Sequence, residues 1–111
     1  MTVVETFEFL KRAKPLMTEP EREELVAFVG ANPEAGEIIP DTGGVRKMRW
    51  ALEGMGKRSG ARVVDYYHGK RLPVFLLSVY SKTQKANLSQ AERNAMKRLV
   101  PAPVAGYARK V

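Results

Sequence analysis

The sequence predicts a single α+β domain in which an antiparallel sheet lies between helices near both ends of the chain. Three segments, 46–52, 61–68 and 72–80, have residue patterns typical of strands and follow one another through short connections. Such a succession is typical of an antiparallel meander. Helix-start signals stand before and after it, at Thr18 and Ser89, each followed by a glutamate three residues later.

The N-terminal third is expected to begin with a short strand at 3–4 and to continue into two helices. The first helix is predicted over 6–16, because residues typical of one helix face recur three and four positions apart, at Phe7, Leu10 and Lys14.

The second helix is predicted from about residue 19 to residue 30. Thr18 is suited to the N-cap, Glu21 completes a capping box, and Pro20 fits the first turn. Both helices are interpreted as scaffold. The side chains expected to be buried on the second helix are Leu25, Phe28 and Val29.

The strand over 46–52 carries the most distinctive pattern, because its residues alternate between two faces. One face collects Met48, Trp50 and Leu52, and the other collects Lys47, Arg49 and Ala51. A glycine-rich loop over 54–60 and a second strand over 61–68 follow.

The third strand, 72–80, is apolar on both faces, which indicates a central, covered position in the sheet. Residues 35–44 are predicted to form a loop with a short apolar centre. A final helix is expected to begin at Ser89 and to end near Val100. Its expected buried side chains are Leu88, Ala95 and Leu99.

Positive charge is concentrated in the middle of the chain. Residues 1–41 have a net charge of −5, residues 42–85 of +8 and residues 86–111 of +4, for a total of +7. This asymmetry indicates an acidic scaffold that carries a basic functional surface. Such a surface could bind nucleic acid, an anionic membrane or an acidic protein. The sequence has no basic amphipathic helix that stands out, so membrane is the weakest of the three.

The first two strands and their loop, over 42–62, hold six basic side chains and a single acid. A solvated face and a phosphate-binding surface both remain open as interpretations of this cluster. Because these cations lie on one strand face and in the adjoining loop, the sequence favours the phosphate-binding surface more than it would for a scattered set of charges. The six residues are Arg46, Lys47, Arg49, Lys57, Arg58 and Arg62.

The composition excludes several classes of site. The chain has no cysteine and a single histidine, His68, so no disulfide, no metal and no cofactor are expected. It shows neither a membrane-length apolar run nor a signal-peptide pattern, which predicts a cytoplasmic protein. Residues 1–100 are expected to form one domain, and residues 101–111 a mobile tail.

Other candidate motifs carry less weight. The stretch 54–58 superficially resembles a phosphate-binding loop, but no Ser or Thr follows Lys57 and the stretch leads into a strand. His68 is interpreted as a surface residue. Three tyrosines remain open to two interpretations, as core residues with hydrated hydroxyls or as platforms for RNA bases. They are Tyr66, Tyr67 and Tyr80.

The runs GGVRKMRWALEGMGKRSGARVVDYY and VFLLSVYSKTQKANLSQAER resemble the RelE superfamily of bacterial toxins, closest to its HigB-like branch. The resemblance covers roughly residues 32–100. It implies a twisted, mainly antiparallel sheet with two helices on one face. It also implies a ribosome-dependent endonuclease that cuts messenger RNA, and a neutralising antitoxin, often of the helix-turn-helix type.

The resemblance further implies which side chains act on RNA. The catalytic positions fall on Lys47, Arg49, Arg62 and Lys82, and the RNA-binding positions on Arg46, Lys57, Arg58 and Lys85. One position departs from the family pattern, because Leu88 stands where RelE proper has a tyrosine. The identity of the general base is therefore open.

A metal-free nuclease must position the 2′-hydroxyl of RNA, stabilise charge on the phosphate and move protons. Arginine contacts phosphate with two parallel donors, whereas lysine can also exchange a proton. We therefore hypothesise that Arg62 is the principal phosphate clamp with Arg49 as its helper. Lys47 would be the base or a charge stabiliser, and Lys82 the acid.

Two alternative functions remain. A ParE-like toxin would poison DNA gyrase without cutting RNA, although the basic strand argues against it. A non-catalytic module would bind RNA or the ribosome without producing cleavage products.

Overall fold

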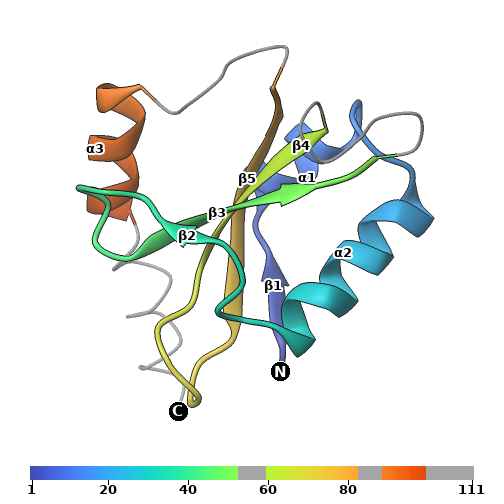
Figure 1. Cartoon of the computed structure of the whole chain (residues 1–111), viewed down its shortest axis with the longest axis horizontal. Helices are drawn as coiled ribbons and strands as arrows, with labels where there is room; N and C mark the ends of the chain where they lie inside the picture. The colour runs from blue at the N-terminus through green and yellow to red at the C-terminus, as the bar shows by residue number, and fades with distance from the viewer. Residues whose placement is uncertain (53–59, 83–88, 100–111) are drawn as a thin grey trace.

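The computed structural model describes residues 1–52, 60–82 and 89–99, and it confirms the predicted α+β class. Helices lie on both sides of a five-stranded sheet (Figure 1). The elements in chain order are β1 (Val3–Glu5), α1 (Phe7–Ala13), α2 (Glu19–Ala31), β2 (Glu37–Ile38), β3 (Val45–Trp50), β4 (Ala61–Tyr66), β5 (Val74–Ser81) and α3 (Gln90–Leu99).

The predicted meander is present as the antiparallel ladder of β3, β4 and β5. The sheet order is β1-β5-β4-β3-β2, so the meander occupies its centre. At one edge β1 pairs in parallel with β5, which makes the sheet mixed. At the other edge β2 pairs with β3, so a segment predicted as loop contains a two-residue strand.

The core lies mainly between the sheet and the first two helices. Phe9 of α1 and Leu25 of α2 are fully buried against sheet residues such as Val63. A smaller cluster, which includes Val64 and Tyr80, lies on the opposite face. In Figure 1, α3 lies on the other side of the sheet from α1 and α2. The predicted packing of two helices on one face is therefore confirmed.

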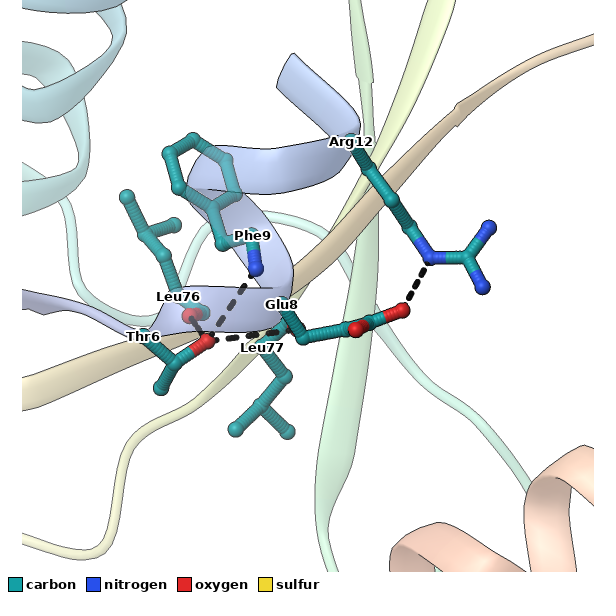
Figure 2. A network of polar contacts seen from close by, with 6 residues as sticks. All are labelled: Thr6, Glu8, Phe9, Arg12, Leu76 and Leu77. Carbon is teal, nitrogen blue, oxygen red and sulfur yellow. Dashed lines mark hydrogen bonds and ion pairs between the residues drawn. The ribbon is translucent and has the colours of Figure 1, made fainter. Parts of the chain in front are cut away.

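The helix α1 is joined to the sheet through its N-cap. The Thr6 hydroxyl accepts from the Phe9 N–H at 3.3 Å and donates to the Leu76 carbonyl of β5 at 2.7 Å (Figure 2). This attachment turns Phe9 and Ala13 towards the core, whereas the Phe7 side chain is 80% exposed. The helix was correctly predicted, but the side-chain spacing used to predict it does not mark its buried face.

The helix α2 has the predicted capping box, with the Glu21 N–H donating to the Thr18 hydroxyl at 3.3 Å. Leu25 and Val29 are buried as expected. The prediction for Phe28 was wrong, since its side chain is 38% exposed. Its ring instead packs at the edge of the core, with its centroid 5.3 Å from that of Trp50.

The helix α3 begins with the predicted cap, because the Glu92 N–H donates to the Ser89 hydroxyl at 3.1 Å. Ala95 is exposed, so its predicted burial was wrong. The predicted burial of Leu88 and Leu99 concerns side chains outside the described part of the chain, as does the predicted tail over 101–111.

The turn before β2 depends on a glycine. Gly36 has φ +91°, and a Cβ there would lie 2.5 Å from the Lys47 carbonyl oxygen. We expect Gly36→Ala to lower the free energy of unfolding by more than about 2 kcal/mol, because backbone strain and a clash with β3 add together. Urea denaturation measures this change.

Gly43 provides the matched control for this substitution. It also has positive φ, +78°, but an added Cβ would meet nothing within 4 Å. Gly43→Ala should therefore cost only the strain of the backbone, about 1 kcal/mol. Equal losses of stability in the two variants would show that the contact with Lys47 is unimportant.

Candidate nucleic-acid interface

The alternation predicted for β3 is present in the structure. Met48 and Trp50 belong to the core under α1 and α2, whereas Val45 belongs to the cluster on the opposite face. Because successive side chains of a strand point to opposite faces, Lys47 and Arg49 share the face of Val45. We call this side of the sheet the cationic face.

Strand register extends the cationic face from β3 to β4. Arg49 pairs directly with Arg62, and Lys47 pairs with Val64. Directly paired residues of an antiparallel ladder have Cβ atoms about 5 Å apart, and diagonal pairs such as Lys47 and Arg62 about 7–8 Å. Three of the four predicted catalytic residues therefore lie together, on the face away from α1 and α2.

The three cations differ in exposure. Arg49 is exposed, Lys47 is half-buried, and Arg62 is only 6% exposed. The Arg62 guanidinium donates from Nη1 to the carbonyl of Ala61 at 3.3 Å. Burial of a cation beside two others strengthens the electrostatic field at this point of the face. Such a field attracts an anion.

The fourth predicted catalytic residue follows β5. Lys82 is exposed, and its backbone N–H donates to the Gly60 carbonyl at 3.3 Å. This bond continues the β4–β5 ladder past its last pair, so Lys82 lies at the end of the sheet where Arg62 is found. Of the predicted RNA-binding residues, Lys57, Arg58 and Lys85 lie outside the described residues, as does Leu88.

Arg46 differs from the other predicted residues in its location. It lies on the side of β3 that carries Met48, and it pairs across the ladder with Asp65 of β4. This placement argues against the RNA-binding role predicted for Arg46. Asp65 is buried and Arg46 half-buried, and neither Arg46 Nη1 nor Asp65 Oδ1 has a hydrogen-bond partner among the described residues.

Burial dominates the ionisation of Asp65. Removal from water raises the pKa of its carboxyl group to about 7, although the nearby Arg46 guanidinium acts in the opposite direction. The neutral acid is therefore favoured in the folded protein up to near-neutral pH.

Sequence reasoning named Tyr80 only as a core or base-stacking tyrosine, and it placed neither Tyr80 nor the helix α3 on the cationic face. Tyr80 of β5 pairs directly with Arg62 and is 2% exposed. Burial raises the pKa of Tyr80, the positive charges of Arg62 and Arg93 lower it, and the negative charge of Glu92 raises it. The α3 residues Glu92 and Arg93 thus lie near Tyr80, the ladder partner of Arg62. No sequence signal indicated this, because the position of α3 depends on tertiary packing.

The other two tyrosines and the histidine lie at and after the end of β4, away from Arg62. Tyr66 and Tyr67 are half-buried, and His68 is exposed, as predicted. The Tyr66 hydroxyl is 3.1 Å from Nδ1 of His68. Tyr66 packs beside the cluster that contains Val45 and Val64, and Tyr67 packs beside the core under α1 and α2.

Two further observations concern ligands and membranes. Within residues 1–52, 60–82 and 89–99, no group of three or more His, Cys, Asp or Glu side chains is placed to hold a metal ion. Over the same residues, no helix combines the length and the apolar character needed to cross a bilayer.

The fold and the cationic face define a small basic α+β protein that is suited to contact a polyanion. A family model described as the RelE toxin of the RelE / RelB toxin-antitoxin system matches residues 3–108. Since the match spans almost the whole sequence, the chain belongs to the RelE toxin family. It is therefore a toxin of a toxin–antitoxin system, and its cognate partner is an antitoxin.

The family assignment confirms the predicted superfamily and gives the general activity. Toxins of the RelE family are generally endoribonucleases that inhibit translation. Assignment to the HigB-like branch stays a prediction.

The ionisation of Asp65 predicts how stability changes with pH. Between about pH 4 and pH 7 the folded state binds a proton that the unfolded state has released, so stability falls as the pH rises through this range. The loss is at most a few kcal/mol, at about 1.4 kcal/mol per pH unit. Urea denaturation from pH 4 to pH 8 measures it.

Substitution by asparagine tests this assignment. Asp65→Asn should flatten the pH dependence and be at least as stable as the parent at pH 8, because asparagine cannot ionise. Asp41→Asn is the control, since Asp41 is exposed and asparagine tolerates its φ of +61°. Equal pH profiles for the parent and Asp65→Asn would contradict the raised pKa.

Proposed function

We propose that this toxin is a ribosome-dependent endonuclease that cuts messenger RNA by attack of a 2′-hydroxyl on the adjacent phosphate. The observation that carries the proposal is the placement of Lys47, Arg49 and Arg62 on one face of two neighbouring strands. A single phosphodiester fits a group of cations with this spacing, and the rigid ladder fixes their relative positions.

The reaction needs little from the protein beyond position and charge. RNA supplies the nucleophile, its own 2′-hydroxyl, and the phosphate gains negative charge as the new P–O bond forms. Arg49 and Arg62, paired across the ladder, offer parallel donors to the non-bridging oxygens. In the proposed mechanism Arg62 is the principal clamp and Arg49 supports it.

Proton transfer is assigned to the two lysines. Lys47, beside Arg49 on β3, would accept the proton of the 2′-hydroxyl or stabilise the charge that replaces it. Lys82, at the end of β5, would protonate the departing 5′-oxygen. Arginine is unsuited to either step because it keeps its proton.

The burial of Arg62 adds a condition to this mechanism. With 6% of its surface exposed, Arg62 can contact a phosphate only after a local rearrangement of the cationic face. The helix α3 is the candidate for this movement, since Glu92 and Arg93 lie near Tyr80, the partner of Arg62 in the ladder. We propose that RNA meets the exposed Arg49 and the half-buried Lys47 first.

The proposal extends to the surroundings of the reaction. Messenger RNA would be cut in the cytoplasm on translating ribosomes, and an antitoxin of the helix-turn-helix type, as in the HigB-like branch, would hold the toxin inactive. Lys57, Arg58 and Lys85 are proposed as further RNA contacts on the strength of sequence resemblance.

Alanine substitutions test the assigned roles. Lys47→Ala and Arg62→Ala should each lower the rate of message cleavage on translating ribosomes by at least about 100-fold, because each removes a charge that stabilises the transition state. Mapping of RNA 5′ ends measures cleavage, and thermal denaturation shows that the variants fold. Because Arg62 is buried, Arg62→Lys provides a second variant that keeps the charge and removes the two parallel donors.

Lys11→Ala is the matched control, because Lys11 is an exposed cation on α1, across the sheet from the cationic face. It should cleave at the rate of the parent. Full cleavage by folded Lys47→Ala and Arg62→Ala would reject the assignment. Ribosome binding by the parent without new RNA ends would indicate a non-catalytic module, and a gyrase–DNA adduct would indicate a ParE-like toxin.

A further inference from the structure

A second cationic site lies at the turn between β4 and β5. The Leu72 N–H donates to the Gly69 carbonyl at 3.2 Å and closes a four-residue turn whose central residues are Lys70 and Arg71. The Val74 N–H donates to the Thr2 carbonyl at 2.9 Å, which brings the N-terminal segment beside this turn. Between the two segments is a hollow of about 410 Å³, lined by Met1, Thr2, Lys70, Arg71, Leu72 and Pro73.

The hollow is electropositive because Lys70 and Arg71 line it and no carboxylate of the described residues does. Over residues 60–82 the sequence contains a single acid, Asp65, and that side chain is 2% exposed on the core side of the sheet. Lys70 and Arg71 are both at least partly exposed and have no ion pair within the described parts of the chain. By contrast, Arg12 and Arg22 are each paired with a glutamate.

This site is separate from the cationic face described above. Arg62 lies near the start of β4, whereas Lys70 and Arg71 follow its end. The four strand steps from Arg62 to Tyr66, at about 3.3 Å each, already separate the two sites by more than about 13 Å. One phosphate cannot contact both, so a ligand that occupies both sites must be an extended polyanion.

We propose that the hollow at Lys70 and Arg71 binds a backbone phosphate of RNA and that it holds the strand without taking part in cleavage. This inference deepens the proposed function, because it takes RNA as the ligand. The guanidinium of Arg71 and the ammonium of Lys70 suit a phosphate held at the mouth of a hollow.

Neighbouring rings favour RNA over an acidic polypeptide. Tyr66 and His68 immediately precede the turn, with ring centroids 6.2 Å apart, and His68 is exposed. Aromatic rings beside cations are the combination that binds single-stranded nucleic acid, since the bases stack while the phosphates are neutralised. An acidic polypeptide would use the cations alone.

The test measures RNA binding without cleavage. A fluorescent single-stranded RNA with 2′-O-methyl groups has no nucleophile, so it reports binding alone. We expect Lys70→Ala/Arg71→Ala to reduce the slope of log affinity against log salt concentration by about 0.7 for each phosphate that the variant no longer neutralises. Lys70→Gln/Arg71→Gln, which removes both charges but keeps longer, polar side chains than alanine, should give the same reduction.

Lys11→Ala/Lys14→Ala is the control, because it removes two exposed cations from the α1 region and changes net charge equally. Its slope should match that of the parent. Equal slopes for both double variants would overturn the inference. The inference would also be overturned if the Lys70/Arg71 variant bound poly-glutamate more weakly while its salt dependence of RNA binding stayed unchanged.

The outcome is distinguishable from failure of the proposed function. Cleavage by the parent together with an unchanged RNA slope in the Lys70/Arg71 variants overturns this site alone. A reduced slope in a protein that does not cut message supports the site while the nuclease proposal fails.

Discussion

The cross-strand register of β3, β4 and β5 is the constraint on which the rest of the structure depends. It aligns Met48, Val63 and Val79 in a row on the face under α1 and α2. The same register aligns Arg49, Arg62 and Tyr80 on the other face. A slip of one residue would exchange the faces of a strand, so burial of the first row fixes the position of the second.

The cationic face is an arrangement that folding alone would not favour. Like charges directly opposite each other on a ladder are destabilising, and Arg49 faces Arg62 in this way. Two glutamates of the N-terminal region, Glu5 and Glu8, pair with cations of the scaffold helices. The core on the helix side must offset the cost of the opposed arginines, a pattern typical of functional sites.

Much of the fold follows from local sequence. The caps at Thr18 and Ser89 are predictable because a side-chain hydroxyl and a glutamate three residues later satisfy the free N–H groups within one turn. The alternation of β3 is predictable because a half-buried strand must segregate Lys47 from Met48. These signals identify the side of β3 that carries the cationic face without any knowledge of tertiary structure.

Features that depend on distant contacts could not be predicted in this way. The exposure of Phe7 results from the attachment of Thr6 to β5, which is far away in sequence. The strand β2 is only two residues long and forms because β3 offers a free edge. The burial of Arg62 and the proximity of Glu92 to Tyr80 require the positions of β5 and α3.

An irregularity in β5 decides which of its side chains joins the cationic face. Asp65 pairs with Leu76, but Val64 pairs with Ser78, so Leu77 is an extra residue in the ladder. Without this bulge Arg62 would face Val79, and Tyr80 would enter the core under the helices. The bulge instead allows Leu76 and Val79, three residues apart, to point to the same side. Since β5 is apolar on both faces, its sequence pattern is compatible with either register. The pairing of β5 with β4 therefore decides which β5 side chains join the cationic face, and only the folded sheet reveals this pairing.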